Sequence, residues 1–256
     1  MGKAKYLEAF ENYLSGFDME DERIRLKYEH TFHVADNCEK IAKSLDLSER
    51  DQETAWKIGM LHDVGRFRQL EKYQTFDDSK SVDHAEYGAD VLFKEGLIDT
   101  FEDSDEDYEV LEKAVRLHNK YRLPEDLEGR EKILCEIIRD ADKVDIFRVD
   151  KEMGMEKIYH VPMSEIEKSL ISKDVYETFL QKKTIPRALH KTIADRMVGH
   201  FALAWELVFE ESRVLVREQG YIFGMMNVDY KEPETVKIIN DVKEKITEYL
   251  GGEKNG

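Results

Sequence analysis

The chain has 256 residues, of which 41% are hydrophobic and 37% are charged. A chain of this length can bury a substantial core. Acidic residues outnumber basic ones, 56 to 39, so the formal net charge is −17. Because such a field repels nucleic-acid backbones and anionic lipid surfaces, we expect neither a nucleic-acid polymer nor a membrane as a partner.

The sequence indicates a cytoplasmic protein. Its N-terminus lacks an apolar signal core, and no stretch approaches the roughly 18 apolar residues that a membrane span needs. The two cysteines, Cys38 and Cys135, lie in apolar helical patterns and form no CxxC pair, which favours buried thiols in a reducing compartment. The sequence gives no oligomeric state.

Apolar residues recur at intervals of three and four along almost the whole chain, which predicts an all-α protein. The expected helices span residues 3–14, 21–45, 49–62, 84–95, 106–119, 129–147, 164–172, 174–182, 187–216 (with a possible break) and 233–249. Residues 64–83 are predicted to be a long polar loop, residues 120–128 a shorter loop, and residues 221–228 a short strand.

The chain contains no linker rich in Gly, Ser or Pro and no internal repeat. We therefore expect a single helical domain over residues 1–250, in which residues 150–250 complete the fold, followed by a disordered tail at 251–256.

Polar residues on apolar helix faces are the informative feature of the first half of the chain. His30 shares a row with Val34 and Cys38, whereas His33 has charged helical neighbours and is expected to face water. The mostly apolar helix over 49–62 ends in the adjacent pair His62-Asp63.

Three further residues follow the same pattern. His84 shares a face with Val91 and Leu92, His118 follows Ala114 and Val115, and Asp142 continues an apolar row through Ile138. A single histidine on an apolar face is usually a hydrogen-bonded core residue. A buried carboxylate, however, costs several kcal/mol unless a cation or strong donors face it. A metal centre would satisfy all of these residues together.

The ordered set resembles the HD superfamily of metal-dependent phosphohydrolases, which is named for the adjacent His-Asp pair. The resemblance covers about residues 25–147, with the metal-binding core at about 21–147. It is carried by Glu29-His30-Thr31, Leu61-His62-Asp63-Val64-Gly65-Arg66 and Asp140-Ala141-Asp142-Lys143. It implies an HD-domain helical bundle, to which residues 150–250 would add C-terminal helices.

The positions of His84 and His118 are similar to those of binuclear members. By this resemblance His30, His62 and Asp142 would bind one metal, His84 and His118 would bind a second, and Asp63 would bridge the two. Asp142 is preferred over Asp140 because of its helix face and its Ala-Asp-Lys context. The implied cofactors are two divalent transition-metal ions (Fe, Mn, Co, Ni or Zn, with Mg as a further option).

Asp63, His62, Arg66 and Lys143 are the expected catalytic residues. Many binuclear relatives carry Lys where this chain has Arg66, whose planar fork suits phosphate oxygens. Further cations near the ligands in sequence are candidates for binding phosphate: Arg68, Lys120, Arg122 and Arg148. The loop residues Thr75, Asp77 and Asp78 are expected to border the pocket.

The predicted function is hydrolysis of a phosphoester of a nucleotide or another small phosphorylated metabolite, by a hydroxide that bridges two metals. Two alternatives stay open. Some HD-fold proteins are mixed-valent di-iron oxygenases with the same ligand pattern, and the chain could also be a metal-binding regulatory module without catalysis.

Overall fold

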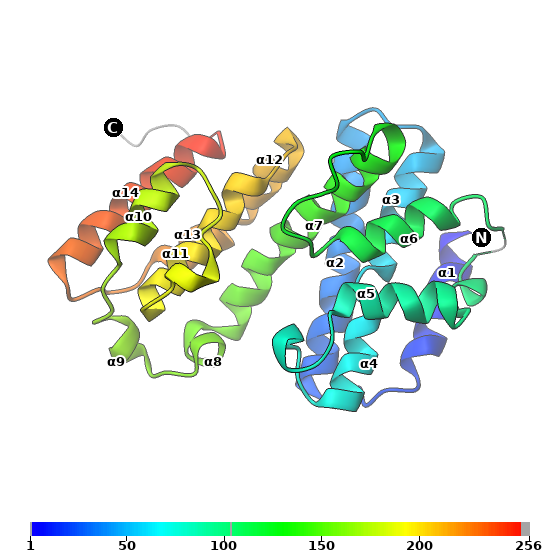
Figure 1. Ribbon diagram of the computed structural model, residues 1–256, viewed down its shortest axis with the longest axis horizontal. Helices are drawn as coiled ribbons and strands as arrows, with labels where there is room; N and C mark the ends of the chain where they lie inside the picture. Colours follow the sequence, from blue (N-terminus) through cyan, green and yellow to red (C-terminus); the bar gives the residue numbers. More distant parts are fainter. Residues whose placement is uncertain (1, 103, 252–256) are drawn as a thin grey trace. The chain divides into compact units, whose positions relative to one another are not determined.

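The computed structural model describes residues 2–102 and 104–251, and no strand occurs among them (Figure 1). The all-α fold predicted from the sequence is therefore confirmed. The backbone forms two compact units, Met1–Asp142 and Lys143–Gly256. The prediction of one domain over 1–250 stays a prediction, and the expected tail lies outside the described residues except for Gly251.

Most of the first unit is helical. Its helices are α1 (Lys3–Leu14), α2 (Glu22–Ser44), α3 (Glu49–Leu61), α4 (Val64–Tyr73), α5 (His84–Ala89), α6 (Tyr108–Leu117) and the first part of α7 (Gly129–Met153). Shorter turns lie at η1 (Asp78–Lys80), η2 (Asp90–Lys94) and η3 (Leu97–Thr100). Ser48 caps α3 by accepting a hydrogen bond from the backbone N–H of Asp51 (3.2 Å).

The long helices α2 and α3 pack closely because a glycine lies between them. A Cβ atom built on Gly59 would lie 2.5 Å from the Cα atom of Ala35, which no real contact allows. Helix α2 can therefore approach α3 backbone to backbone. This contact fixes His30 on α2 relative to His62 at the end of α3.

The prediction of a continuous loop over 64–83 is wrong, because residues 64–73 form helix α4. Val64, Phe67 and Leu70 are buried at helical spacing, but the charged residues between them conceal the apolar stripe in the sequence. Helix α4 ends at Gln74, which adopts a left-handed conformation (φ 56°). The segment between α4 and α5 is thus much shorter than expected.

Helices α4 and α5 also meet at a pair of glycines. A Cβ atom on Gly65 would lie 2.4 Å from the carbonyl oxygen of His84 and 2.6 Å from the backbone nitrogen of Gly88. Only glycine at position 65 permits this contact. It brings the start of α5, with His84, next to the junction that carries Asp63.

The second unit continues α7 and contains only helices and turns in the part that is described. These are α8 (Met155–Tyr159), α9 (Met163–Ile166), α10 (Lys173–Leu180), η4 (Arg187–Leu189), α11 (Ile193–Phe201), η5 (Ala202–Glu206), α12 (Glu210–Gln219), α13 (Tyr221–Met226) and α14 (Pro233–Tyr249). None of the helices from residue 2 to 102 or 104 to 251 is both long and apolar enough to cross a bilayer.

Two predictions for this unit have clear outcomes. The helix expected over 187–216 is broken, the alternative that the sequence left open, because η4, α11, η5 and α12 divide that range. The short strand expected at 221–228 is wrong. Ile222, Met225 and Met226 are buried on one face of helix α13. In an apolar run of only eight residues, such a pattern does not distinguish a helix from a strand.

Candidate metal centre

Five segments of the first unit bring together the six side chains that the sequence singled out. Helix α2 carries His30, the α3–α4 junction carries His62 and Asp63, α5 begins with His84, His118 follows α6, and Asp142 lies on α7. All are buried except Asp142, whose side chain is 20% exposed. Two groups with the spacing of metal ligands share Asp63, one with His30 and His62 and one with His84 and His118.

The two carboxylate oxygens of Asp63 face different histidine pairs. Oδ2 lies 3.5 Å from Nε2 of His62 and 3.7 Å from Nε2 of His30. Oδ1 lies 3.6 Å from Nε2 of His84 and 3.8 Å from Nε2 of His118. The side chain of Asp63 therefore stands between two imidazole pairs, one on each oxygen.

Asp142 belongs to the first of these pairs. Its Oδ1 atom lies 3.1 Å from Nε2 of His30 and 4.0 Å from Nε2 of His62. By contrast, His33 on the same helix as His30 is exposed, as the sequence predicted. The helix faces predicted from the sequence, buried for His30 and exposed for His33, are therefore correct.

The outer ring nitrogens of three histidines are held by acceptors. Nδ1 of His62 lies 2.7 Å from the carbonyl oxygen of Gly59, and Nδ1 of His118 lies 2.7 Å from that of Val115. Nδ1 of His84 lies 2.6 Å from Oδ2 of Asp78. Each Nδ1 must donate a proton to its acceptor, so each ring, when neutral, has a lone pair on Nε2. This is the arrangement in which outer contacts orient histidines that bind metals.

The inward atoms lack the partners that buried polar groups need. Nε2 of His62 and Oδ1 of Asp63 are buried without a hydrogen-bond partner among the described residues. Nε2 of His84 lies 3.0 Å from Nε2 of His118, so two lone pairs face each other. Divalent cations would satisfy all these atoms, because imidazole and carboxylate are ligands of such ions. The side chains present therefore fit divalent metal ions.

The electrostatic environment keeps the acidic ligands ionised. Burial alone would raise the pKa of Asp63, but the adjacent Lys27 ammonium and the neighbouring His62 ring outweigh burial and hold this pKa well below its usual value. Partial burial would also raise the pKa of Asp142, but the hydrogen bond with His30 and the neighbouring imidazoles hold it far below the ordinary value. Burial, with the neighbouring imidazoles of His84 and His62, lowers the pKa of His118 to about 3. These are the protonation states that metal binding requires.

Two cations adjoin Asp63. Nζ of Lys27 donates to Oδ2 of Asp63 (2.7 Å), and Nε of Arg66 lies 3.7 Å from Oδ1. Sequence reasoning missed Lys27, although it precedes His30 by three residues and so lies one helical turn away on the same face. Arg66 is also tied to the following segment, because its Nη1 atom donates to the carbonyl oxygen of Phe76 (2.7 Å) and to Asp78 (2.8 Å).

The other cations that the sequence proposed for phosphate binding contact protein groups. Arg68 pairs with Glu95, Lys120 with Asp83 and Glu86, and Arg148 with Asp145 and Glu152, while Arg122 lies over the ring of Tyr121. Lys143, in the second unit, has its Nζ atom 3.4 Å from Oε2 of Glu206. The structure thus gives each of these cations a partner, and a role in phosphate binding stays a prediction.

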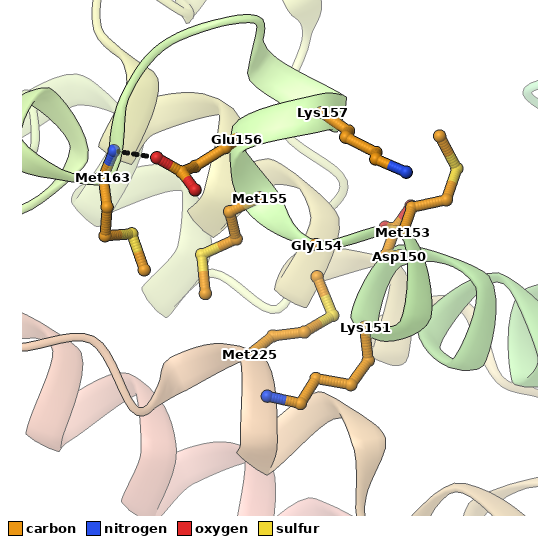
Figure 2. A pocket seen from close by; sticks show the side chains of 9 residues that line it. All are labelled: Asp150, Lys151, Met153, Gly154, Met155, Glu156, Lys157, Met163 and Met225. Atoms are coloured by element: carbon orange, nitrogen blue, oxygen red, sulfur yellow. Dashed lines mark hydrogen bonds between the residues drawn. The ribbon is translucent and has the colours of Figure 1, made fainter.

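A separate pocket of about 330 Å³ lies within the second unit, where methionine side chains provide much of its lining (Figure 2). Met153, Met155, Met163 and Met225 line it, and Glu156 accepts a hydrogen bond from the backbone N–H of Met163 (2.7 Å). Among residues 2–102 and 104–251, no cluster of three or more possible metal ligands lies in this pocket. Its flexible thioether lining differs in chemistry from the metal centre.

The fold and the buried ligands define a helical protein with a His/Asp site suited to metal ions. Residues 28–146 match the family described as the HD domain, and this match contains all six candidate ligands. This match, which covers just under half of the chain, places residues 28–146 in the HD-domain superfamily, whose members are mostly metal-dependent hydrolases. Comparison with curated proteins and with solved structures gave no match.

Proposed function

We propose that this protein is a metal-dependent phosphohydrolase that cleaves a phosphoester of a nucleotide or of another small phosphorylated metabolite. Membership of the HD-domain superfamily supports the reaction class. The acidic net charge of −17 argues against a polymeric nucleic acid as the substrate.

One observation carries this proposal. Asp63 directs one carboxylate oxygen toward His30 and His62 and the other toward His84 and His118, with all four distances between 3.5 and 3.8 Å. A carboxylate in this position can bridge two cations, since each oxygen can bind a different ion. We infer that His30, His62 and Asp142 hold one ion and that His84 and His118 hold the other.

Two divalent ions, when bound, would supply an activated water and neutralise the charge of a phosphate group. The residues of the chain then have separate tasks. The carbonyl oxygens of Gly59 and Val115 fix the rings of His62 and His118 through Nδ1. The surrounding apolar helices exclude bulk water, which strengthens every charge interaction at the centre.

Lys27 and Arg66 are the cations best placed to receive phosphate oxygens, since both adjoin Asp63. Arg66 already contacts Asp78, so we infer that it also positions the segment after α4. Lys143 remains a proposed phosphate ligand on the strength of its place directly after Asp142.

A hydrolysis screen tests the function. The purified protein, loaded in turn with Mn, Fe, Co, Ni, Zn or Mg, is incubated without oxygen with nucleotides and sugar phosphates, and released phosphate is measured. We expect turnover with at least one metal, and we expect it to be lost in His62→Ala and Asp63→Ala.

Two other outcomes would replace the proposal. Product formation that stops when oxygen is removed would indicate a di-iron oxygenase. Wild-type rates no higher than those of Asp63→Ala across the whole panel would indicate a metal-binding module without catalysis. His33→Ala is the matched control, because that histidine lies on α2 but faces solvent.

A further inference from the structure

The aromatic ring of Phe76 lies beside the metal centre and near two cations. The ring centroid is 5.8 Å from Nζ of Lys27 and 5.7 Å from Cζ of Arg66. The same Lys27 ammonium donates to Asp63 at 2.7 Å. Phe76 is half-buried. An aromatic surface and two cations therefore border the same carboxylate.

The position of Phe76 is set mainly by its backbone and its neighbours. Nη1 of Arg66 donates to the carbonyl oxygen of Phe76 (2.7 Å), and the side-chain amide of Gln69 donates to Asp78 (2.9 Å). Gln69 is buried and also donates to Ser81 and to the carbonyl oxygen of Val82. These contacts hold the segment in place, so the ring is not needed as its anchor.

We propose that Phe76 is a stacking platform for the base of a nucleotide whose phosphate group reaches the cations beside Asp63. This inference rests on the proposed function and narrows its substrate class. The π face of a phenylalanine ring binds any nucleobase by stacking, with little preference for its identity. Lys27 and Arg66, which lie 5.8 and 5.7 Å from the ring centroid, provide positive charge in a protein that is strongly acidic as a whole. A nucleoside monophosphate is a small ligand that uses both features, whereas a sugar phosphate uses only the cations.

The competing explanation is that Phe76 serves only to pack against Lys27 and Arg66. In that case, removal of the ring would disturb both cations and weaken every phosphorylated ligand equally. The two explanations are separated by ligands that share a phosphate and a ribose but differ in the base.

The test compares two non-hydrolysable phosphonates, in which CH₂ replaces the bridging oxygen of adenosine 5′-monophosphate and of ribose 5-phosphate. Their dissociation constants are measured by titration calorimetry on the full chain loaded with Mn²⁺. We expect wild type to bind the adenosine analogue about tenfold more tightly than the ribose analogue. Phe76→Leu should abolish this ratio, while Phe76→Tyr, which keeps a π face, should preserve it.

The stacking proposal would be overturned if Phe76→Leu weakened the binding of both analogues equally and so left the ratio of their dissociation constants unchanged. It would also be overturned if wild type bound neither analogue. The readout is independent of turnover. Phe76-dependent base preference in a protein that hydrolyses nothing would support the stacking site and refute the hydrolase. Hydrolysis of a nucleoside monophosphate with the same KM in wild type and Phe76→Leu would support the hydrolase and refute stacking.

Discussion

Nε2 of His84 lies 3.0 Å from Nε2 of His118, while Nδ1 of each ring contacts an acceptor, Asp78 Oδ2 or the carbonyl oxygen of Val115. With the protons on the outer nitrogens, the two inner lone pairs repel each other unless a cation lies near both. This pair, together with Oδ1 of Asp63, is the part of the site that most directly calls for a second metal ion.

Replacing Asp78 should weaken metal binding at the His84 pair. Asp78 accepts from Nδ1 of His84 and orients its inner nitrogen, and loss of such an outer contact typically lowers metal affinity by about 10- to 100-fold. Competition with a chelator measures the affinity of Asp78→Asn. Asp77→Asn is the matched control, because its carboxylate contacts Ser79 and Lys80. Equal affinities in both variants would contradict this role for Asp78.

Replacing Lys27 should impair substrate binding and leave metal content intact. Its ammonium is the cation closest to Asp63, and a hydrogen bond to a charged group contributes about 1.5–3 kcal/mol. Lys27→Met should therefore raise KM for a phosphoester at least about tenfold. Lys40→Met, on an exposed face of the same helix, should behave as wild type. A variant of Lys27 that loses its metals would show that the ammonium supports the ligands instead.

The glycine contact between α4 and α5 should be essential for stability. Gly65→Ala would place a methyl group 2.4 Å from the backbone oxygen of His84, so the helices must separate, at a cost of about 3 kcal/mol. Chemical denaturation of the metal-free protein measures this loss. Gly16→Ala, whose new Cβ meets only the carbonyl oxygen of Tyr13 at 3.6 Å, should change stability by less than about 0.5 kcal/mol. Similar stability in both variants would refute the close contact.

Asp107 should stabilise the first unit in a manner that depends on pH. It contacts Arg50 (3.1 Å) and Arg130 (3.0 Å). Burial would raise the pKa of Asp107, but the hydrogen bond from Arg50 and the charges of Arg130 and Arg50 outweigh it and lower this pKa.

A carboxyl group with a lowered pKa in the folded state stabilises the protein above the ordinary pKa of about 3.9 and loses this effect as pH falls through the lower value. Asp107→Asn should thus cost about 1 kcal/mol at neutral pH and progressively less below pH of about 4. The free energies of unfolding of wild type and Asp107→Asn, measured by denaturation at neutral pH and at a pH below about 4, test this prediction. A stability difference between the two proteins that grows as the pH falls would contradict the prediction.

Much of the candidate site could be predicted from helical spacing. His30, His84 and His118 interrupt apolar rows, and the rows themselves place these side chains inside the protein. Their assembly around Asp63 depended on the resemblance, because periodicity assigns a face to each helix but gives no contact between helices.

The missed features depend on contacts that spacing alone does not reveal. Charged residues dilute the buried stripe of Val64, Phe67 and Leu70, so the sequence of helix α4 is typical of a loop. Nothing in the sequence indicates a role for Lys27, because a lysine is normally solvated and the ion pair with Asp63 depends on the packing of α2 beside the α3–α4 junction. The position of Phe76 depends on a hydrogen bond that Arg66 donates to its carbonyl oxygen, ten residues further along the chain.

The content of bound metal tests the central claim most directly. The metal-free protein is reconstituted anaerobically, excess metal is removed, and the remaining ions are counted by elemental analysis. We predict about two ions per chain for wild type and His33→Ala, about one for His84→Ala, and fewer than two for Asp63→Ala. The proposed metal centre would be contradicted if wild type retained no ion of any metal. It would also be contradicted if His33→Ala lost as much bound metal as His84→Ala.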